Sequence, residues 1–562
     1  MLERAERLFS PLGVGPVCSG CAENIFMEAA VMPLLFVLVL FGFLGAQSPL
    51  VVGSQKQLFI DYKFIESSEG IQLVVQEPYQ TREKLVVVDQ PWEKDAYLAS
   101  YNTVIKEDGR IRLWYDLAAG APPAGEKNPR YMGVAYAESQ DGIHFTKPVL
   151  NLVKWNGSKK NNLVLPPDPE VLAIGGGSVW RDDNPHCPEQ ARYKSWIKVY
   201  PRNASGIQGP HRVFLSPDGI HWQLDERLVT GLRAADTQPS WFWEPRIGRY
   251  IGYSREWIRE KSGFGVRAAS YNESDDLLHW DNMAMVLEPD ERDMAAAPAM
   301  RLDVSRLQVR GENILPQRHA TAAAVEGGDD QVLTPAAPLD FYGPGVFPYE
   351  NVYLALVPVF YHWKGSANEA WPNTSDIQLA VSRDGRHFHR PGGRASFLRT
   401  GENGSWDSKW IYPVLRPISM GDQLWIYYFG TNRDHASRLD SQAVERESAI
   451  SRAILRLDGF IAAVADYAGA SLITPPLLFQ GKRLELNLAA GAGGYARIEI
   501  LDESGKPAPG FTLHDSDELN GNSVRMAATW NGQTDLSALE GKPIRLHIRM
   551  RSAKLYAFQF LP

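Results

Sequence analysis

Cysteine is scarce in this chain: only Cys18, Cys21 and Cys187 occur among 562 residues. Cys18 and Cys21 form a C-x-x-C pattern that lies upstream of an apolar run, with no folded context around it. If the N-terminal segment is removed, Cys187 stands alone. The mature chain is then expected to have no intrachain disulfide and no metal site built on cysteine.

An excess of basic residues is also missing. The chain has 58 Lys and Arg against 66 Asp and Glu, a formal net charge of −8. Because phosphate backbones are bound by a basic face, we expect no nucleic acid as partner. The composition, 44% apolar and 22% charged, is typical of a folded chain. Its length is too great for one ordinary core, so we expect two domains and a leader.

Long hydrophobic runs are absent after residue 46. The one such run, residues 29–46, ends in small residues, which is typical of a signal peptide cleaved near Ala46. A single membrane anchor is the alternative, because 18 residues is the lower limit for spanning a bilayer. We therefore expect residues 1–46 to be a signal peptide or leader. The rest is expected to be exported, periplasmic or secreted, with no membrane contact beyond that anchor.

One short motif recurs along the chain: Ser-x-Asp-Gly-x-His-aromatic. It occupies residues 139–145, 216–222 and 382–388, and a degenerate copy occupies 274–280. Each copy follows a short strand-like run, and Asp-Gly is a tight hairpin signal. The motif has two interpretations, a ligand loop or a turn that closes the outer hairpin of a repeated unit. The turn is favoured.

A longer repeat precedes each of these turns. It consists of an apolar strand, a polar hairpin and an aromatic-rich strand, and no long amphipathic helix interrupts it. Five such units predict a five-bladed β-propeller over residues 47–465. The paired strands are 97–105 with 111–115, 174–180 with 193–200, 239–243 with 250–253, 345–347 with 352–361, and 411–417 with 423–429.

Three further segments flank or interrupt the repeats. Residues 57–77 are strand-like and are expected to close the ring against the fifth blade. Residues 288–338 are rich in Ala and Pro and read as an insertion between blades three and four. Residues 466–562 alternate apolar and polar positions, which predicts a β-sandwich. The expected fold class is therefore all-β, a propeller followed by a sandwich.

Propeller topology sorts the polar residues by position. The inner strands surround a central channel, so residues before an inner strand and residues ending the second strand share one mouth. Hairpin acids such as Asp182 and Asp183 fall on the opposite face. The mouth set comprises the acids Glu93, Asp95, Asp236, Asp340 and Asp407, the second-strand residues Asp116, Lys198, Arg255, His362 and Arg433, and the aromatic residues Trp241, Tyr342 and Trp410.

Converging carboxylates are what glycosidic cleavage needs. One carboxyl group protonates the leaving oxygen and another acts as base or nucleophile. Crowding of like charges raises the pKa of one of them, while arginine and histidine hold sugar hydroxyls. Any single acid at a strand start could simply hydrogen-bond the backbone of a loop. One polar residue from each blade at the same level of the channel favours a functional site. The expected partner is an oligosaccharide or polysaccharide.

Four stretches resemble glycoside hydrolase families 32, 43 and 68, and most closely a bacterial group similar to the family 32 N-terminal domain. They are residues 58–66, the repeated Ser-x-Asp-Gly motif, residues 349–356 with 361–363, and residues 422–428. The C-terminal sandwich is similar to the one that follows family 32 propellers. The resemblance implies a nucleophile or base from blade one, a stabilising Asp from blade two and an acid Glu from blade three.

Only part of that pattern is present in this sequence. Asp95 fits the blade-one position, whereas blade three offers Asp236 in place of Glu. We therefore predict Asp236 and Asp340 as the central catalytic pair with Asp95 in support. The predicted substrate-binding residues are Asp407, Arg255, His362, Asp116, Arg433, Trp241, Tyr342 and Trp410.

Two other functions stay open beside an exported glycoside hydrolase. A glycoside phosphorylase would use Lys198, Arg255, His362 and Arg433 to hold phosphate. A non-catalytic propeller would bind glycan without cleaving it. No cofactor is expected, and since no Asp-x-Asp-x-Asp loop occurs, a channel calcium ion is only a minor option.

Overall fold

The computed structural model describes residues 48–119, 132–166, 172–175, 178–201, 211–232, 237–259, 265–301, 338–363, 373–433 and 445–562. Within these ranges strands dominate, and the one α-helix is α1 (Glu291–Ala296), which lies in the predicted insertion. No helix of the described ranges is long and apolar enough to cross a membrane. The predicted leader, residues 1–46, lies outside the described residues and stays a prediction.

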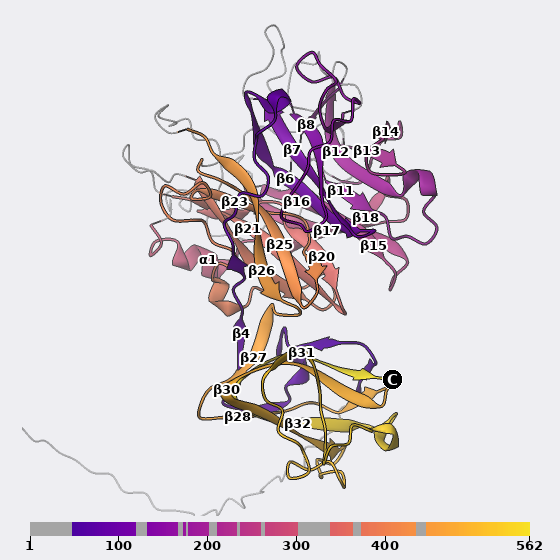
Figure 1. Cartoon of the computed structure of the whole chain (residues 1–562), viewed down its shortest axis with the longest axis vertical. Coiled ribbons are helices and arrows are strands. Elements are labelled where there is room, and N and C mark those ends of the chain that lie inside the picture. The colour runs from indigo at the N-terminus through magenta and orange to yellow at the C-terminus, as the bar shows by residue number, and fades with distance from the viewer. Residues whose placement is uncertain are drawn as a thin grey trace, which may run out of the picture. The chain divides into compact units, whose positions relative to one another are not determined.

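The propeller is formed by five antiparallel blades (Figure 1). The predicted all-β class and its five repeats are confirmed. A bridge between Ser375 and Trp410 links blades four and five into one hydrogen-bonded sheet. Blade one consists of β6 (Ala96–Glu107), β7 (Arg110–Ala119), β8 (Met132–Ser139) and β9 (Leu163–Leu165), and blade two of β10 (Leu172–Gly175), β11 (Val179–Arg181), β12 (Tyr193–Pro201), β13 (His211–Ser216) and β14 (Gln223–Leu224). Blade three consists of β15 (Ser240–Glu244), β16 (Arg249–Arg259), β17 (Gly265–Ser274) and β18 (Trp280–Leu287). Blade four consists of β19 (Leu339–Phe341), β20 (Gly345–Tyr349), β21 (Val352–His362) and β22 (Asn373–Ser382), and blade five of β23 (Trp410–Pro413), β24 (Ile418–Met420), β25 (Gln423–Thr431) and β26 (Ser448–Arg456).

The ring is closed by the closing segment, residues 79–86, near the N-terminal end of the described chain. Strand β5 (Tyr79–Gln80) pairs antiparallel with β26, and Val86 bridges to Ile450. The prediction that residues 57–77 close the ring is wrong, because the closing segment begins just after them. Blade five thus joins two parts of the chain that are far apart in sequence.

Residues 50–75 instead complete the C-terminal sheet. Strands β1 (Leu50–Gly53), β2 (Gln57–Leu58), β3 (Ser67–Glu69) and β4 (Gln72–Val75) pair with C-terminal strands, and in Figure 1 these indigo strands lie among the orange and yellow ones. Their partners are β27 (Ile461–Ala465), β28 (Ala470–Ile473), β29 (Leu477–Phe479) and β32 (Ile544–Leu561), and β32 also pairs with β30 (Arg483–Asp502), which pairs with β31 (Asn522–Ala527).

The sandwich core follows from alternation along its longest strands. In β30, Leu484, Leu486, Ile498 and Ile500 are buried, while Glu485 and Glu499, which lie between the members of each pair, are more exposed. This two-residue period places one face of the strand on a dry core. Opposite it, the ring of Phe479 stacks on Phe560 with centroids 4.0 Å apart.

The recurring Ser-x-Asp-Gly motif forms a compact turn. In the first copy the Ser139 hydroxyl accepts the backbone N–H of Gly142, and Asp141 Oδ1 accepts the N–H groups of Ile143 and His144. The His144 ring nitrogen Nδ1 lies 2.7 Å from Asp141 Oδ2. The copies at Asp218, Asp276 and Asp384 repeat this pattern. The structure therefore supports the turn interpretation.

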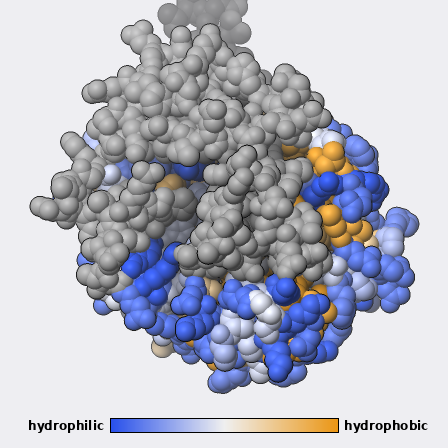
Figure 2. All heavy atoms as spheres, turned by 90° about the horizontal axis from the view of Figure 1, so that it is seen from above, coloured by the Kyte–Doolittle hydropathy of each residue, from blue (hydrophilic) through white to orange (hydrophobic). Residues whose placement is uncertain are grey.

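Side chains near the axis join neighbouring blades. The Thr103 hydroxyl of blade one accepts the backbone N–H of Val179 in blade two, at 3.1 Å. Ser240 of blade three likewise accepts the N–H of Val346 in blade four, at 3.0 Å. Inner strands are edge strands, so such bonds satisfy backbone groups that would otherwise be unpaired. Seen from above in Figure 2, the described surface is mainly hydrophilic with separate hydrophobic patches.

Candidate active site at the propeller mouth

Asp340 is the centre of a charged cluster where blades three and four meet. It lies on β19, opposite Phe360 of β21, and is fully buried. Its Oδ2 accepts a hydrogen bond of 2.8 Å from Arg267 Nη1. The Nε2 atom of His362, at the end of β21, lies 3.5 Å from the same oxygen. Three strands thus bring one carboxylate and two basic side chains together.

The charge of Asp340 is set by this environment. Burial alone would raise the pKa of the carboxyl group, but the nearby Arg267 guanidinium and the His362 ring outweigh it and lower the pKa to about 2. The group is therefore ionised at any ordinary pH. Its Oδ1 accepts no hydrogen bond from the described residues. Asp340 is suited to hold cations in place and unsuited to donate a proton.

His362 is oriented from its other ring nitrogen. Its Nδ1 lies 3.0 Å from Oδ1 of Asn373, at the start of β22. An amide oxygen only accepts, so this contact is a hydrogen bond in the tautomer with the proton on Nδ1. The ring also packs against Phe360, with centroids 4.5 Å apart. This arrangement turns Nε2 toward Asp340.

An aromatic cage encloses the cluster. Tyr342, Phe360 and Trp410 meet edge to face, with centroids 5.0–5.8 Å apart. The Arg267 guanidinium lies 5.5 Å from the Tyr342 ring and 5.3 Å from the Phe360 ring. Arg255, on β16, lies 5.8 Å from the same Tyr342 ring. Both guanidinium groups are therefore placed by cation–π contacts as well as by charge.

The structure thus brings together five of the residues predicted from sequence: Asp340, His362, Arg255, Tyr342 and Trp410. Asp236, the other member of the predicted central pair, lies outside the described residues. Asp95 is exposed just before β6 and has a left-handed backbone with φ of 63°. The partners described for Asp340 are Arg267 and His362, so Asp95 is not one of them.

Asp407 has a different environment from the one expected. Its buried carboxylate is bound by Arg82 at 3.1 Å and by the hydroxyl groups of Ser405 and Tyr428 at 2.8 and 3.3 Å. Arg82 belongs to the segment that closes the ring. The substrate-binding role of Asp407 stays a prediction; in the structure its charge joins blade five to the closing segment.

Trp241 is also placed away from the cluster. It is buried, and its ring lies on Trp180 with centroids 4.1 Å apart, in the core between blades two and three. The role in sugar stacking stays a prediction; in the structure the ring packs against the neighbouring blade. Among the other predicted residues, Asp116 is buried in β7, where its N–H donates to Asn102, and Arg433 follows β25 half-buried.

Two acids excluded by topology are engaged at the hairpin face. Asp182 is buried and accepts hydrogen bonds from Lys194 and Tyr250. Asp183 is exposed and lies 3.5 Å from Arg181. Both are in or beside the polar turn after β11, as the topology predicted. Glu93, which was predicted to lie at the mouth, is buried and bonded to Lys147 and Tyr115.

Sequence reasoning missed Arg267 and Asn373. Only residues before inner strands and at the ends of second strands were predicted to lie at the mouth, but third strands also begin there. Arg267 and Asn373 stand at the start of β17 and β22, the third strands of blades three and four. Extending the same rule by one strand would have found both. In the described ranges, no group of three or more His, Cys, Asp or Glu is arranged to hold a metal ion.

Comparison with known proteins gives similarity in structure only. No family model and no curated protein matches the sequence, so the resemblance to families 32, 43 and 68 stays a prediction. A β-1,2-mannobiose phosphorylase from Listeria innocua is 12% identical, with 68% of this chain and 97% of that chain covered and a TM-score of 0.42. A glycosyl hydrolase from Bacteroides ovatus is 13% identical, with coverage of 72% and 97% and a TM-score of 0.39. An N-acetylgalactosamine deacetylase from F. plautii is 13% identical, with coverage of 69% and 96% and a TM-score of 0.40.

Proposed function

We propose that this chain is an enzyme that cleaves glycosidic bonds in an oligosaccharide or polysaccharide bound at the propeller mouth. The observation that carries the proposal is the ionised Asp340 held between Arg267 and His362 beside an aromatic cage. This cluster offers hydrogen-bond donors held in fixed positions next to apolar ring faces. Sugars present hydroxyl groups and apolar faces of matching kinds.

Asp340 acts in this proposal as a positioning residue. It is fully buried and its pKa is about 2, so it neither reaches a substrate nor supplies a proton. What it does is fix the guanidinium of Arg267, whose side chain is 13% exposed. Charge-assisted bonds of this kind are short and directional. Arg267 is then the group that grips a sugar hydroxyl or an anionic oxygen.

The proton transfers need other carboxyl groups. Cleavage requires a general acid for the leaving oxygen and a second carboxylate as base or nucleophile. Asp236 and Asp95 are the proposed pair, since both precede inner strands of the propeller. In this proposal Asp95 takes the place of Asp340 in the predicted central pair.

A glycoside phosphorylase is the second candidate, and one observation favours it. Two guanidinium groups, Arg255 and Arg267, approach the same Tyr342 ring. Arginine pairs suit bidentate recognition of phosphate oxygens. In this alternative, phosphate replaces water as the group that attacks the sugar, and the product is a sugar phosphate.

One experiment separates these reactions. The purified chain is incubated with a panel of oligosaccharides, with and without inorganic phosphate, and new reducing ends and sugar phosphates are measured. Hydrolysis predicts reducing ends in both conditions, whereas phosphorolysis predicts sugar phosphate only when phosphate is added. Binding of glycans without either product contradicts the proposed enzyme and supports a non-catalytic propeller.

A further inference from the structure

A second polar feature lies on the propeller axis, at the hairpin end of the central channel. Residues of the innermost segments of all five blades line a narrow pocket there, among them Thr103, Trp180, Ser240, Phe347 and Arg416, the last between β23 and β24. The channel has room at this level for a particle about the size of a water molecule. It is therefore too narrow for a sugar ring, and it is separate from the Asp340 cluster.

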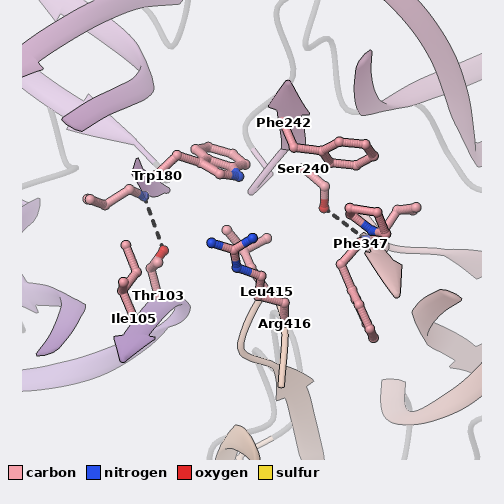
Figure 3. Close-up of a pocket in the computed structure, with 11 residues that line it drawn as sticks. Thr103, Ile105, Trp180, Ser240, Phe242, Phe347, Leu415 and Arg416 are labelled. Atoms are coloured by element: carbon pink, nitrogen blue, oxygen red, sulfur yellow. Dashed lines mark hydrogen bonds between the residues drawn. The ribbon is translucent and has the colours of Figure 1, made fainter. Parts of the chain in front are cut away.

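Arg416 is the one charged residue that lines this pocket. Figure 3 shows its guanidinium group in the middle of the ring of labelled side chains. No carboxylate is among the lining residues, and the charged groups that act on Arg416 among the described residues are Asp183 and Arg181. Burial lowers the pKa of this guanidinium, and the charge of Asp183 offsets part of that effect. Arg416 is half-buried and no carboxylate lines its pocket, so its charge is only partly compensated, which is unfavourable.

The charged side chains near Arg416 are either positive themselves or already paired with another residue. Asp183 lies 3.5 Å from Arg181 and its side chain is 57% exposed. Glu107, close to Arg181, is bound by Arg112 at 2.7 Å. Arg112, Arg181 and Arg416 thus face two carboxylates. The local balance leaves one positive charge in excess at the channel.

Other groups at the pocket are donors. Figure 3 shows the indole nitrogen of Trp180 on the edge of its ring that faces Arg416. The hydroxyl oxygen of Thr103 already accepts the Val179 N–H, which leaves its own O–H to be donated. Ser240 Oγ is used twice, as donor to Pro344 and acceptor from Val346. The pocket therefore presents donors and apolar walls.

We propose that the hairpin end of the channel binds a small inorganic anion, a halide such as chloride, between the Arg416 guanidinium and the Trp180 indole N–H. The halide neutralises the excess charge and links blade five to blade two across the axis. Room for one small particle favours a halide over a larger oxyanion. The role is structural, and it is independent of the reaction at the mouth.

Thermal unfolding tests the site. Sodium chloride and sodium gluconate are compared at equal ionic strength, with gluconate as an anion too large for the channel. The midpoint is expected to rise by about 2 °C with chloride, saturably, and not with gluconate. Arg416→Met is expected to lose this chloride-specific rise and Trp180→Phe to weaken it. Arg110→Met, which removes an exposed arginine that faces Glu138, is expected to keep it.

A direct measurement covers the case in which Arg416→Met does not fold. Crystals of the unaltered chain soaked in bromide are expected to show an anomalous peak beside Arg416 and Trp180. Equal stabilisation by chloride and gluconate, a chloride effect that persists in Arg416→Met, or no bromide peak in the channel each overturns the proposal.

Discussion

Arg82 Nη1 lies 3.1 Å from Asp407 Oδ2, although 325 positions separate the two residues in the chain. The carboxylate is fully buried, while the arginine side chain is 39% exposed. Two residues before Arg82, strand β5 ends its pairing with β26. The ion pair therefore fixes the closing segment onto blade five, much as the strand pairing does.

Loss of Arg82 is expected to weaken ring closure. Arg82→Met leaves a buried carboxylate without its cation, and we expect the free energy of unfolding to fall by about 2–3 kcal/mol. Asp407→Asn is expected to lower the free energy of unfolding by less than Arg82→Met does, because the Arg82 side chain that it leaves unpaired can be solvated by water. Urea unfolding measures both. Arg399→Met, which breaks an exposed pair with Glu77, is the control and should change stability by less than about 1 kcal/mol. Equal stability of Arg82→Met and Arg399→Met contradicts the role in closure.

The Ser-Asp-Gly turns are expected to make stability fall in acid. For Asp218, burial alone would raise the pKa, but hydrogen bonds from the backbone and ring of His221 lower it to about 2, against an ordinary value of 3.8. Because the folded value is the lower one, the stabilisation is complete above about pH 4 and is lost as the pH falls through about 2. Asp218→Asn should remove about 1 kcal/mol of this dependence after allowance for solvent screening.

Unfolding curves between pH 2 and pH 7 check this expectation. Asp108→Asn, in an exposed hairpin turn, is the matched control and should follow the unaltered chain across the range. If Asp218→Asn retains the same pH dependence as that control, the turn carboxylates do not carry the acid sensitivity.

Asp376 is expected to give stability the opposite pH dependence from Asp218. Burial raises the pKa of this β22 carboxyl group to about 6, despite hydrogen bonds from Ser396 and Tyr361. The folded protein then holds the proton more tightly than the unfolded chain, so stability falls as the pH rises from about 4 to 6 and levels off above. Asp376→Asn should abolish that slope and be more stable at pH 7.5 by about 1–2 kcal/mol. A variant less stable than the parent at pH 7.5 argues that the ionised carboxylate is needed.

The blades could be predicted from sequence because their signals are local. Each unit carries its own hairpin and aromatic strand, and Asp-Gly turns recur after them. Ring closure was misplaced because β2 is only two residues long and pairs with Ala557 and Phe558, about 500 residues away. A short segment has no local preference that distinguishes one partner sheet from another.

The candidate site could be predicted in part for the same reason. Topology placed Asp340 and His362 at one mouth, since both stand at strand ends. It could not identify the partner of Asp407, because Arg82 comes from a distant loop. Nor could it show that Trp241 packs on Trp180, since aromatic residues at strand starts look alike whether they face a channel or a neighbouring blade. No sequence pattern indicated a site at Arg416.

The activity of Asp340→Asn tests the central claim most directly. On an oligosaccharide that the chain cleaves, loss of the charge that holds Arg267 should lower kcat/KM by about 100-fold or more. Asp422→Asn, in an exposed pair with Arg525 on the hairpin face, should leave it unchanged. If Asp340→Asn proves unstable, Arg267→Lys keeps the positive charge but not the geometry and should show a similar loss. Cleavage by folded Asp340→Asn and Arg267→Lys at the rate of the unaltered chain contradicts the account.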